Sequence, residues 1–330
     1  MAGSRLSFTS YLSSFLSSLP FFGSSNSENT SSTTMSEPYE PSIADVLIVK
    51  AMLTKGICKS LPRELVDLVL DYAEYWPHMT VHESFNNQCV ARGRSNRENR
   101  LILRTPPIGL KAPNWSTNAN DTVFRPAPKD QTYSPETFQP FRVSPDPMLL
   151  RPCRRIVFTI RSHDQGWGGQ FEDQGTFHGS WTWFEVGLER FVKPECGEGP
   201  EEGEKPTLRP DHLGTVLPLV EPDGEENGKR KYKPKHPLLP TPAVTIQVNR
   251  VAEQEYAEHK VVWSWDDYLD DNDTEAKAKL EENGRGSETG NGEFVRNLQL
   301  GDVITVWAKA RFPGWENWID WAKVDIYFAV

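Results

Sequence analysis

The period of hydrophobic and polar residues changes once along the chain, near residue 78. Before this point, apolar residues recur at helical spacing in residues 43–52 and 61–73. After it, short stretches of alternating apolar and polar residues recur as far as residue 330. Helical spacing is typical of a helix with one buried face, and alternation is typical of a half-buried strand. The pattern therefore predicts a short helical segment followed by a β domain.

Two helices are expected in residues 42–77. Ser42 is a suitable N-cap for the first helix, and Ser60 is a suitable N-cap for the second. Pro62 falls in the first turn of the second helix, where the N–H that proline lacks would have no intrahelical partner. The buried stripe expected for the second helix consists of Leu61, Leu65, Leu68, Val69, Tyr72 and Ala73.

Strands are expected throughout residues 78–330. The alternating stretches cover residues 78–85, 101–104, 155–161, 180–186, 243–248, 260–265, 302–310 and 321–330. Short strands, long polar connections and the lack of strand–helix–strand alternation predict a mainly β fold, an antiparallel β-sandwich of jelly-roll type. The general pattern resembles galactose-binding-like sandwiches.

Three polar segments lie outside this pattern. Residues 1–41 are rich in Ser and Thr and are expected to be disordered. Residues 194–240 and 266–292 interrupt the β domain as charged insertions, which are also expected to be disordered. The basic run at residues 229–235 has two interpretations, a nuclear import signal or a solvated loop tip.

Charge and cysteine usage narrow the functional classes. The chain has 36 Lys and Arg against 46 Asp and Glu, a net charge of −10, which disfavours general binding of nucleic acids. The four cysteines form no Cys-x-x-Cys pair, which indicates reduced thiols in the cytoplasm, the nucleus or both. No apolar run approaches the roughly 20 residues of a membrane-spanning helix, so no membrane span is expected.

Catalysis by a metal site would depend on acidic and histidine side chains near the third predicted strand. These candidates are His163, Asp164, Glu172, Asp173 and His178. No histidine spacing typical of metal sites and no Gly-x-Ser-x-Gly nucleophile motif accompanies them. We therefore expect that the chain is not an enzyme and that it binds neither a metal ion nor a cofactor.

A binding site is the stronger hypothesis for the same region. The loop at residues 163–169 is expected to face the aromatic loop at residues 313–318. Flat rings beside planar polar groups suit sugars or peptides. The candidate ligand-binding residues are His163, Asp164, Gln165, Trp167, Trp315, Asn317 and Trp318. The alternative is structural: His163, Asp164 and Gln165 would satisfy turn amides, and Trp181 and Trp183 would fill the core.

The second helix carries a resemblance to a known motif. Residues 61–72 begin Leu-Pro-Arg-Glu-Leu and continue as an apolar stripe, which resembles the opening helix of an F-box. The resemblance covers about the first third of an F-box, because a strand pattern follows Pro77. It implies binding to the linker protein of a ubiquitin ligase, with a client protein on the sandwich. The implied contact residues are Leu61, Pro62, Leu65, Leu68 and Val69. An ordinary amphipathic helix lying against the β domain is the alternative.

A longer resemblance covers residues 61–330. It rests on Ser-His-Asp-Gln-Gly-Trp at residues 162–167, Ser-Trp-Thr-Trp-Phe-Glu at 180–185 and Arg-Phe-Pro-Gly-Trp at 311–315. Together with Glu-Tyr-Trp-Pro at 74–77, these motifs are similar to a family of uncharacterised fungal proteins. The resemblance implies a shared fold but no activity. The chain is thus expected to be a non-enzymatic binding or adaptor module, with carbohydrate binding as the alternative.

Overall fold

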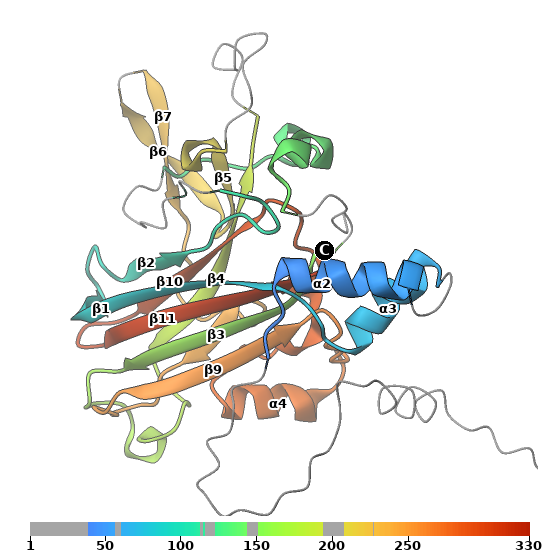
Figure 1. Cartoon of the computed structure of the whole chain (residues 1–330). Coiled ribbons are helices and arrows are strands. Elements are labelled where there is room, and N and C mark those ends of the chain that lie inside the picture. The colour runs from blue at the N-terminus through green and yellow to red at the C-terminus, as the bar shows by residue number, and fades with distance from the viewer. Residues whose placement is uncertain are drawn as a thin grey trace, which may run out of the picture. The chain divides into compact units, whose positions relative to one another are not determined.

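Two antiparallel sheets form the sandwich in the computed structural model (Figure 1). The first sheet has the order β1 (His78–Arg92), β11 (Glu316–Phe328), β3 (Cys153–His163) and β9 (Ala257–Ser264). The second has the order β2 (Asn99–Arg104), β10 (Val303–Ala310), β4 (Thr182–Phe191) and β5 (Leu213–Leu217), and β8 (Thr245–Val248) also pairs with β4. The predicted mainly β, antiparallel and sandwich-like fold is confirmed, although the strand order does not identify a jelly roll.

The structure describes residues 39–56, 61–112, 115, 123–143, 151–193, 208–226 and 228–330. Predicted disorder in residues 1–38 and the predicted N-cap Ser60 lie outside this range. Within it, Ser42 caps α2 (Ile43–Ala51) as predicted, because its side chain accepts a hydrogen bond from the Asp45 N–H at 3.2 Å. A π-helical turn, η1 (Met52–Gly56), follows α2. After residues 57–60, which are not described, α3 (Arg63–Tyr72) begins with Pro62 as its N-cap, whereas the sequence predicted Pro62 inside the first turn.

The core lies between the inner faces of the two sheets. Ile156, Phe158 and Ile160 of β3 are fully buried on the face that their alternation predicts. The Phe158 ring packs edge-on against Trp263 of β9 at 5.1 Å between centroids. Phe184 and its alternate neighbours on β4 close the core from the second sheet. The smaller helices lie in the connections: η3 (Lys129–Gln131), η4 (Pro135–Phe141), η5 (Phe171–Asp173), η6 (Pro210–His212), η7 (Thr289–Asn291) and α5 (Glu293–Arg296).

The outer face of the second sheet holds buried charges. Glu185 of β4 pairs with Lys309 of β10, and Glu189 accepts two hydrogen bonds from Arg104 at 2.8 and 3.0 Å. All four side chains are almost fully buried. The backbone N–H of Thr241 also donates to Glu185 at 3.2 Å. Segments that the sequence describes only as connections therefore cover this face and exclude water from it.

The prediction of disorder in the two charged insertions is wrong for their described parts. The described residues of the first insertion include β5 and a hairpin of β6 (Val220–Glu226) and β7 (Lys229–Pro234). The basic run lies largely on β7, where Lys231 pairs with Glu226 and Lys233 pairs with Asp223 at 3.0 Å. Residues 274–282 form α4 (Thr274–Glu282), with Asp273 as its N-cap. Cross-strand charge pairs and a cap are local stabilising features that overall composition does not reveal.

A buried ion pair holds α3 on the sandwich. Both oxygens of Asp71 accept hydrogen bonds from the Arg154 guanidinium, at 2.8 and 2.9 Å. The indole N–H of Trp76 donates to the same carboxylate at 2.9 Å, and the Trp265 ring lies 4.4 Å from the guanidinium carbon. On the same side of α3, Asp67 pairs with Lys50 of α2 at 2.6 Å.

The predicted buried stripe of α3 is wrong. The buried side chains are Val66 and Leu70, whereas Leu65, Leu68 and Tyr72 are 46%, 61% and 65% exposed. The ion pairs explain the difference, because Asp67 and Asp71 follow Val66 and Leu70 directly and turn this face toward the sandwich. The prediction considered apolar residues alone and so selected the opposite face.

Replacing Arg154 with methionine should strongly destabilise the protein. Arg154→Met leaves the Asp71 carboxylate partly buried without its cation, so the free energy of unfolding should fall by about 3 kcal/mol. Arg63→Met is the control, since Arg63 is half exposed and lies 3.9 Å from Asp67; it should change stability by less than about 1 kcal/mol. Urea unfolding measures both. Equal losses in the two variants would contradict the role of the buried pair.

Candidate binding site

Two loops meet at one end of the sandwich, as the sequence predicts. The loop after β3 reaches the loop before β11, where the Gln165 side chain accepts a hydrogen bond from the Glu316 N–H at 3.2 Å. Gly314 has a φ of +90°, and a Cβ atom on it would lie 3.1 Å from the ring of Trp167. Glycine therefore permits both the turn and the close approach of the indole.

Three aromatic side chains at this end are exposed to solvent. Trp167 is 64% exposed, Phe171 is 86% exposed and Phe312 is 40% exposed. Phe312 contacts the half-buried Trp181 edge-on, at 4.6 Å between ring centroids. Trp315 is half-buried beneath the loop, beside Gly169. We call Trp167, Phe171 and Phe312 the aromatic end.

Asp164 has a structural environment. Its carboxylate is fully buried and accepts hydrogen bonds from the backbone N–H groups of Gly166 at 2.8 Å, Ala252 at 2.7 Å and Glu253 at 3.0 Å. Burial raises the pKa of this carboxyl, and the three N–H groups oppose that rise. Asp164 thus joins two loops that are far apart in sequence, and it is not open to a ligand.

Asn317 is also buried, in a network that links both sheets. Its amide donates to the carbonyl oxygens of Trp183 at 3.1 Å and Lys309 at 3.2 Å. Its side-chain oxygen accepts from Asn249 at 3.0 Å, and Asn249 accepts in turn from Ser162 at 2.7 Å. With every polar atom of the Asn317 amide engaged, this residue cannot contact a ligand as predicted.

His163 and Trp318 lie together on the first sheet, beside the aromatic end. Their rings are parallel with centroids 6.1 Å apart, and Tyr256 packs edge-on against His163 at 4.4 Å. Burial lowers the pKa of the His163 imidazole. The Trp318 indole N–H donates to Glu316 at 3.0 Å. All three rings are half-buried and support the loops.

The two rings of the Trp-x-Trp motif at residues 181–183 differ in burial. Trp181 precedes β4 and is only half-buried, so the core role predicted for it is wrong. Trp183 is fully buried, and its N–H donates to Glu185 at 2.9 Å. The Arg311 guanidinium lies over the same ring at 5.0 Å. The core role predicted for Trp183 is thus confirmed, on the covered outer face of the second sheet.

Phe171 and Phe312 are functional candidates that the sequence interpretation did not include. Phe171 stands between Gln170 and Glu172, and Phe312 precedes Pro313-Gly314. A large apolar side chain in a short polar or turn-forming segment belongs to no helical or alternating pattern of apolar residues, so nothing in the sequence predicts that it is buried. That local context is the signal that could have identified both residues.

The residues of the metal hypothesis do not converge. His178 pairs with Asp173 at 2.8 Å on the surface, whereas Asp164 binds backbone N–H groups elsewhere. Among the residues that the structure describes, no group of three or more His, Cys, Asp or Glu side chains could hold a metal ion.

A second candidate surface lies on α3. Leu65, Leu68 and Tyr72 follow one another at helical spacing and are exposed, and we call them the α3 apolar face. Pro62 is exposed at the helix start, whereas Leu61 and Val69 are half-buried. Of the predicted contact residues, the structure therefore leaves Pro62, Leu65 and Leu68 most accessible, with Tyr72 as an addition.

No family model, curated protein or solved structure matches the chain. The resemblances to an F-box helix and to a fungal family stay predictions. In the described part of the chain, no helix is long and apolar enough to cross a membrane.

Removing the Asp164 carboxylate should destabilise the loops, whereas removing the Trp167 ring should not. Asp164→Ala leaves three buried N–H groups without an acceptor, so the free energy of unfolding should fall by about 3 kcal/mol. Trp167→Ala should lower it by less than about 1 kcal/mol, because the ring is mostly exposed. Urea unfolding compares them, and a larger loss in Trp167→Ala would contradict this division of roles.

Proposed function

We propose that the chain is a non-enzymatic adaptor that binds two proteins. The α3 apolar face binds the linker protein of a ubiquitin ligase, and the aromatic end binds a client protein. The observation that carries the proposal is the exposure of Leu65, Leu68 and Tyr72 on a helix that a buried ion pair holds in place. Function in the cytoplasm or the nucleus is part of the proposal.

The spacing of the α3 apolar face suits a groove in a partner protein. Positions 65, 68 and 72 follow the i, i+3, i+7 pattern with which amphipathic helices enter apolar grooves. Burying one leucine side chain contributes about 1.5–3 kcal/mol. Because α3 is already fixed on the sandwich, binding would not require the helix to fold first. The Leu-Pro-x-Glu-Leu resemblance is the reason for naming the ubiquitin-ligase linker as the partner.

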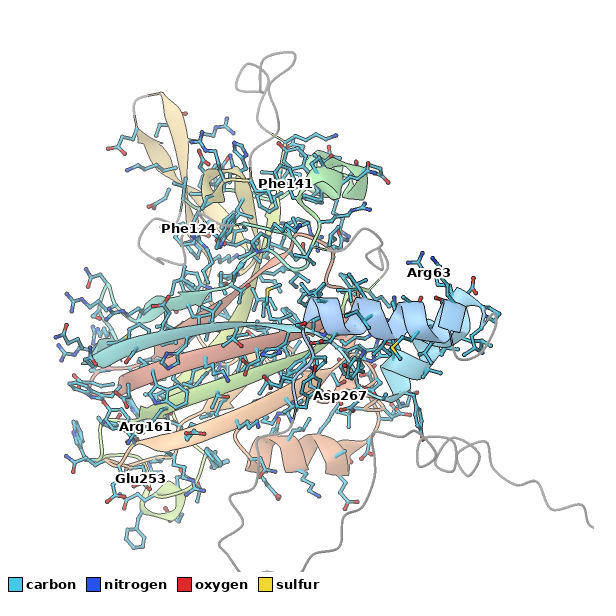
Figure 2. All side chains as sticks on the ribbon, in the orientation of Figure 1. Arg63, Phe124, Phe141, Arg161, Glu253 and Asp267 are labelled. Carbon is cyan, nitrogen blue, oxygen red and sulfur yellow. The ribbon has the colours of Figure 1, made fainter. Side chains whose placement is uncertain are left out.

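The two surfaces lie far enough apart for two partners. Figure 2 shows Arg63 of α3 at the opposite end of the sandwich from Arg161 and Glu253, which lie near the aromatic end. Exposed aromatic side chains are enriched in protein interfaces and contribute strongly to binding. An adaptor needs such a separation, because a scaffold and a client must bind together.

The two cysteines that the structure describes, Cys89 and Cys153, are free and buried. Burial raises the pKa of Cys89 to about 11 and that of Cys153 to about 12. Both stay protonated near neutral pH and are poor nucleophiles.

Changing the α3 apolar face should abolish recovery of the linker protein. Full-length chain purified from native cells should carry the ubiquitin-ligase linker, and Leu65→Asp with Leu68→Asp should remove it without lowering the melting temperature. Leu238→Asp with Leu239→Asp is the matched control, since it places the same two charges at comparably exposed leucines on another surface. Absence of the linker from a wild-type purification that retains other partners would contradict the proposal, as would recovery by the double variant.

Carbohydrate binding is the second candidate, favoured by the geometry of Trp167. Its indole is mostly exposed and lies so close to Gly314 that a Cβ atom there would be 3.1 Å from the ring. The amide of Gln165 donates a hydrogen bond to the Trp167 carbonyl beside it. An exposed ring beside a planar amide suits the apolar face and the hydroxyls of a sugar.

A glycan array tests this candidate directly. Wild-type chain should bind a subset of glycans, and Trp167→Ala should lose that binding while Trp115→Ala, which changes a ring outside the aromatic end, retains it. A blank array on which known lectins are positive would exclude carbohydrate as the ligand of the aromatic end.

A further inference from the structure

A groove of about 680 Å³ lies between α4 and the edge strand β9. Figure 1 shows α4 running beside β9, on the side of the first sheet away from β1. Gln247 of β8 and Asn283, at the end of α4, also line the groove. Neither the aromatic end nor the α3 apolar face contributes to it.

Basic side chains that form no salt bridge line this groove, although the charge of Asp267 acts on one of them, Arg285. The lining contains four of them: Arg250, Lys260, Lys279 and Arg285. None of the four forms a salt bridge within the described residues, although the partly or fully buried Arg104, Arg154 and Arg190 are each paired with a carboxylate. The chain has more acidic than basic residues, so four cations without a salt bridge around one groove are not a consequence of composition.

Arg285 is the most constrained of these cations. It is half-buried, and its Nη2 atom makes only long hydrogen bonds, 3.4 Å to the Val262 carbonyl and 3.5 Å to Thr289. Its Nε atom is buried and has no hydrogen-bond partner within the described residues. Desolvation lowers the pKa of this guanidinium. A partly desolvated cation with unused donors favours binding of an anion that can accept from them.

The charges in the groove suit a dianion. Two carboxylates, Glu258 and Asp267, also line it, so four cations minus two anions leave a net charge of +2. His259 adds none near neutral pH, because burial and the neighbouring Arg250 lower its pKa to about 4. A phosphate monoester carries a charge of about −1.5 to −2 at pH 7. The guanidinium fork also matches the geometry of phosphate oxygens.

The groove is larger than a phosphate ion requires. Its volume falls within the roughly 300–1,000 Å³ of small-molecule sites. Beside the charges it offers an exposed Tyr268 ring and the apolar side chains of Leu269 and Leu280. These groups can contact a sugar or a base that carries the phosphate.

We propose that the groove binds a small organic phosphate. Arg285 and the neighbouring lysines bind the phosphate group, and Tyr268, Leu269 and Leu280 contact the organic part. The proposal is independent of the adaptor function, since the two use different residues.

Thermal shift of the full chain tests the groove with defined probes. Millimolar AMP or glucose 6-phosphate should raise the melting temperature, whereas adenosine and glucose should not. If AMP acts at a lower concentration than glucose 6-phosphate, the ligand is a nucleotide. The reverse order indicates a sugar phosphate. Lys260→Glu with Lys279→Glu should weaken binding at least about tenfold, because each change replaces an attractive charge by a repulsive one. Both lysines are exposed, so the fold should persist.

Lys277→Glu is the matched control, because Lys277 lies on α4 but does not line the groove. It should keep wild-type binding. The proposal is overturned if neither phosphate ester shifts the melting temperature of the wild-type chain. It is also overturned if inorganic phosphate gives the full shift at the same concentration, or if Lys277→Glu weakens binding as much as the double variant.

Discussion

The buried ion pair between Asp71 and Arg154 determines how the helical segment meets the sandwich. It fixes the rotation of α3 by holding one of its faces, with Val66 and Leu70, against the β domain. The opposite face, with Leu65, Leu68 and Tyr72, is thereby left to solvent. A helix held only by apolar contacts would be expected to bury its most hydrophobic face. Here the geometry of the bidentate pair outweighs that tendency, and this produces the surface on which the proposed scaffold interaction depends.

Local periodicity was sufficient to predict most strands of the two sheets, but not β5 or the β6–β7 hairpin. The alternation of Ile156, Phe158 and Ile160 identified both β3 and its inner face, and Ser42 identified the start of α2. The exposed face of α3 could not be predicted from local sequence, because it depends on the pair between Asp71 and Arg154, which lies 83 residues away. The order in the β6–β7 hairpin depends on cross-strand pairs such as Lys233 with Asp223. Composition suggested a solvated insertion instead.

The motifs that look most functional in the sequence mostly stabilise the fold. Asp164 binds the N–H groups of Ala252 and Glu253, and Asn317 joins the two sheets through Asn249. Buried polar residues of this kind are costly to lose, and sequence alone does not distinguish them from ligand-binding residues. What they support is Trp167, the one predicted ligand-binding ring that is mostly exposed. Of the predicted site, Trp167 is thus the part that is open to a ligand. Asp164 and Asn317 stabilise the loops and sheets around it.

We propose that α3 presents its apolar face to a scaffold protein while staying fixed to the sandwich. Calorimetric titration of the purified ubiquitin-ligase linker protein into the full chain measures this interaction. Binding to the wild-type chain should be saturable, and binding to Leu68→Asp should be at least about tenfold weaker at an unchanged melting temperature. No heat of binding with the wild-type chain, or equal affinity for the variant, would contradict it.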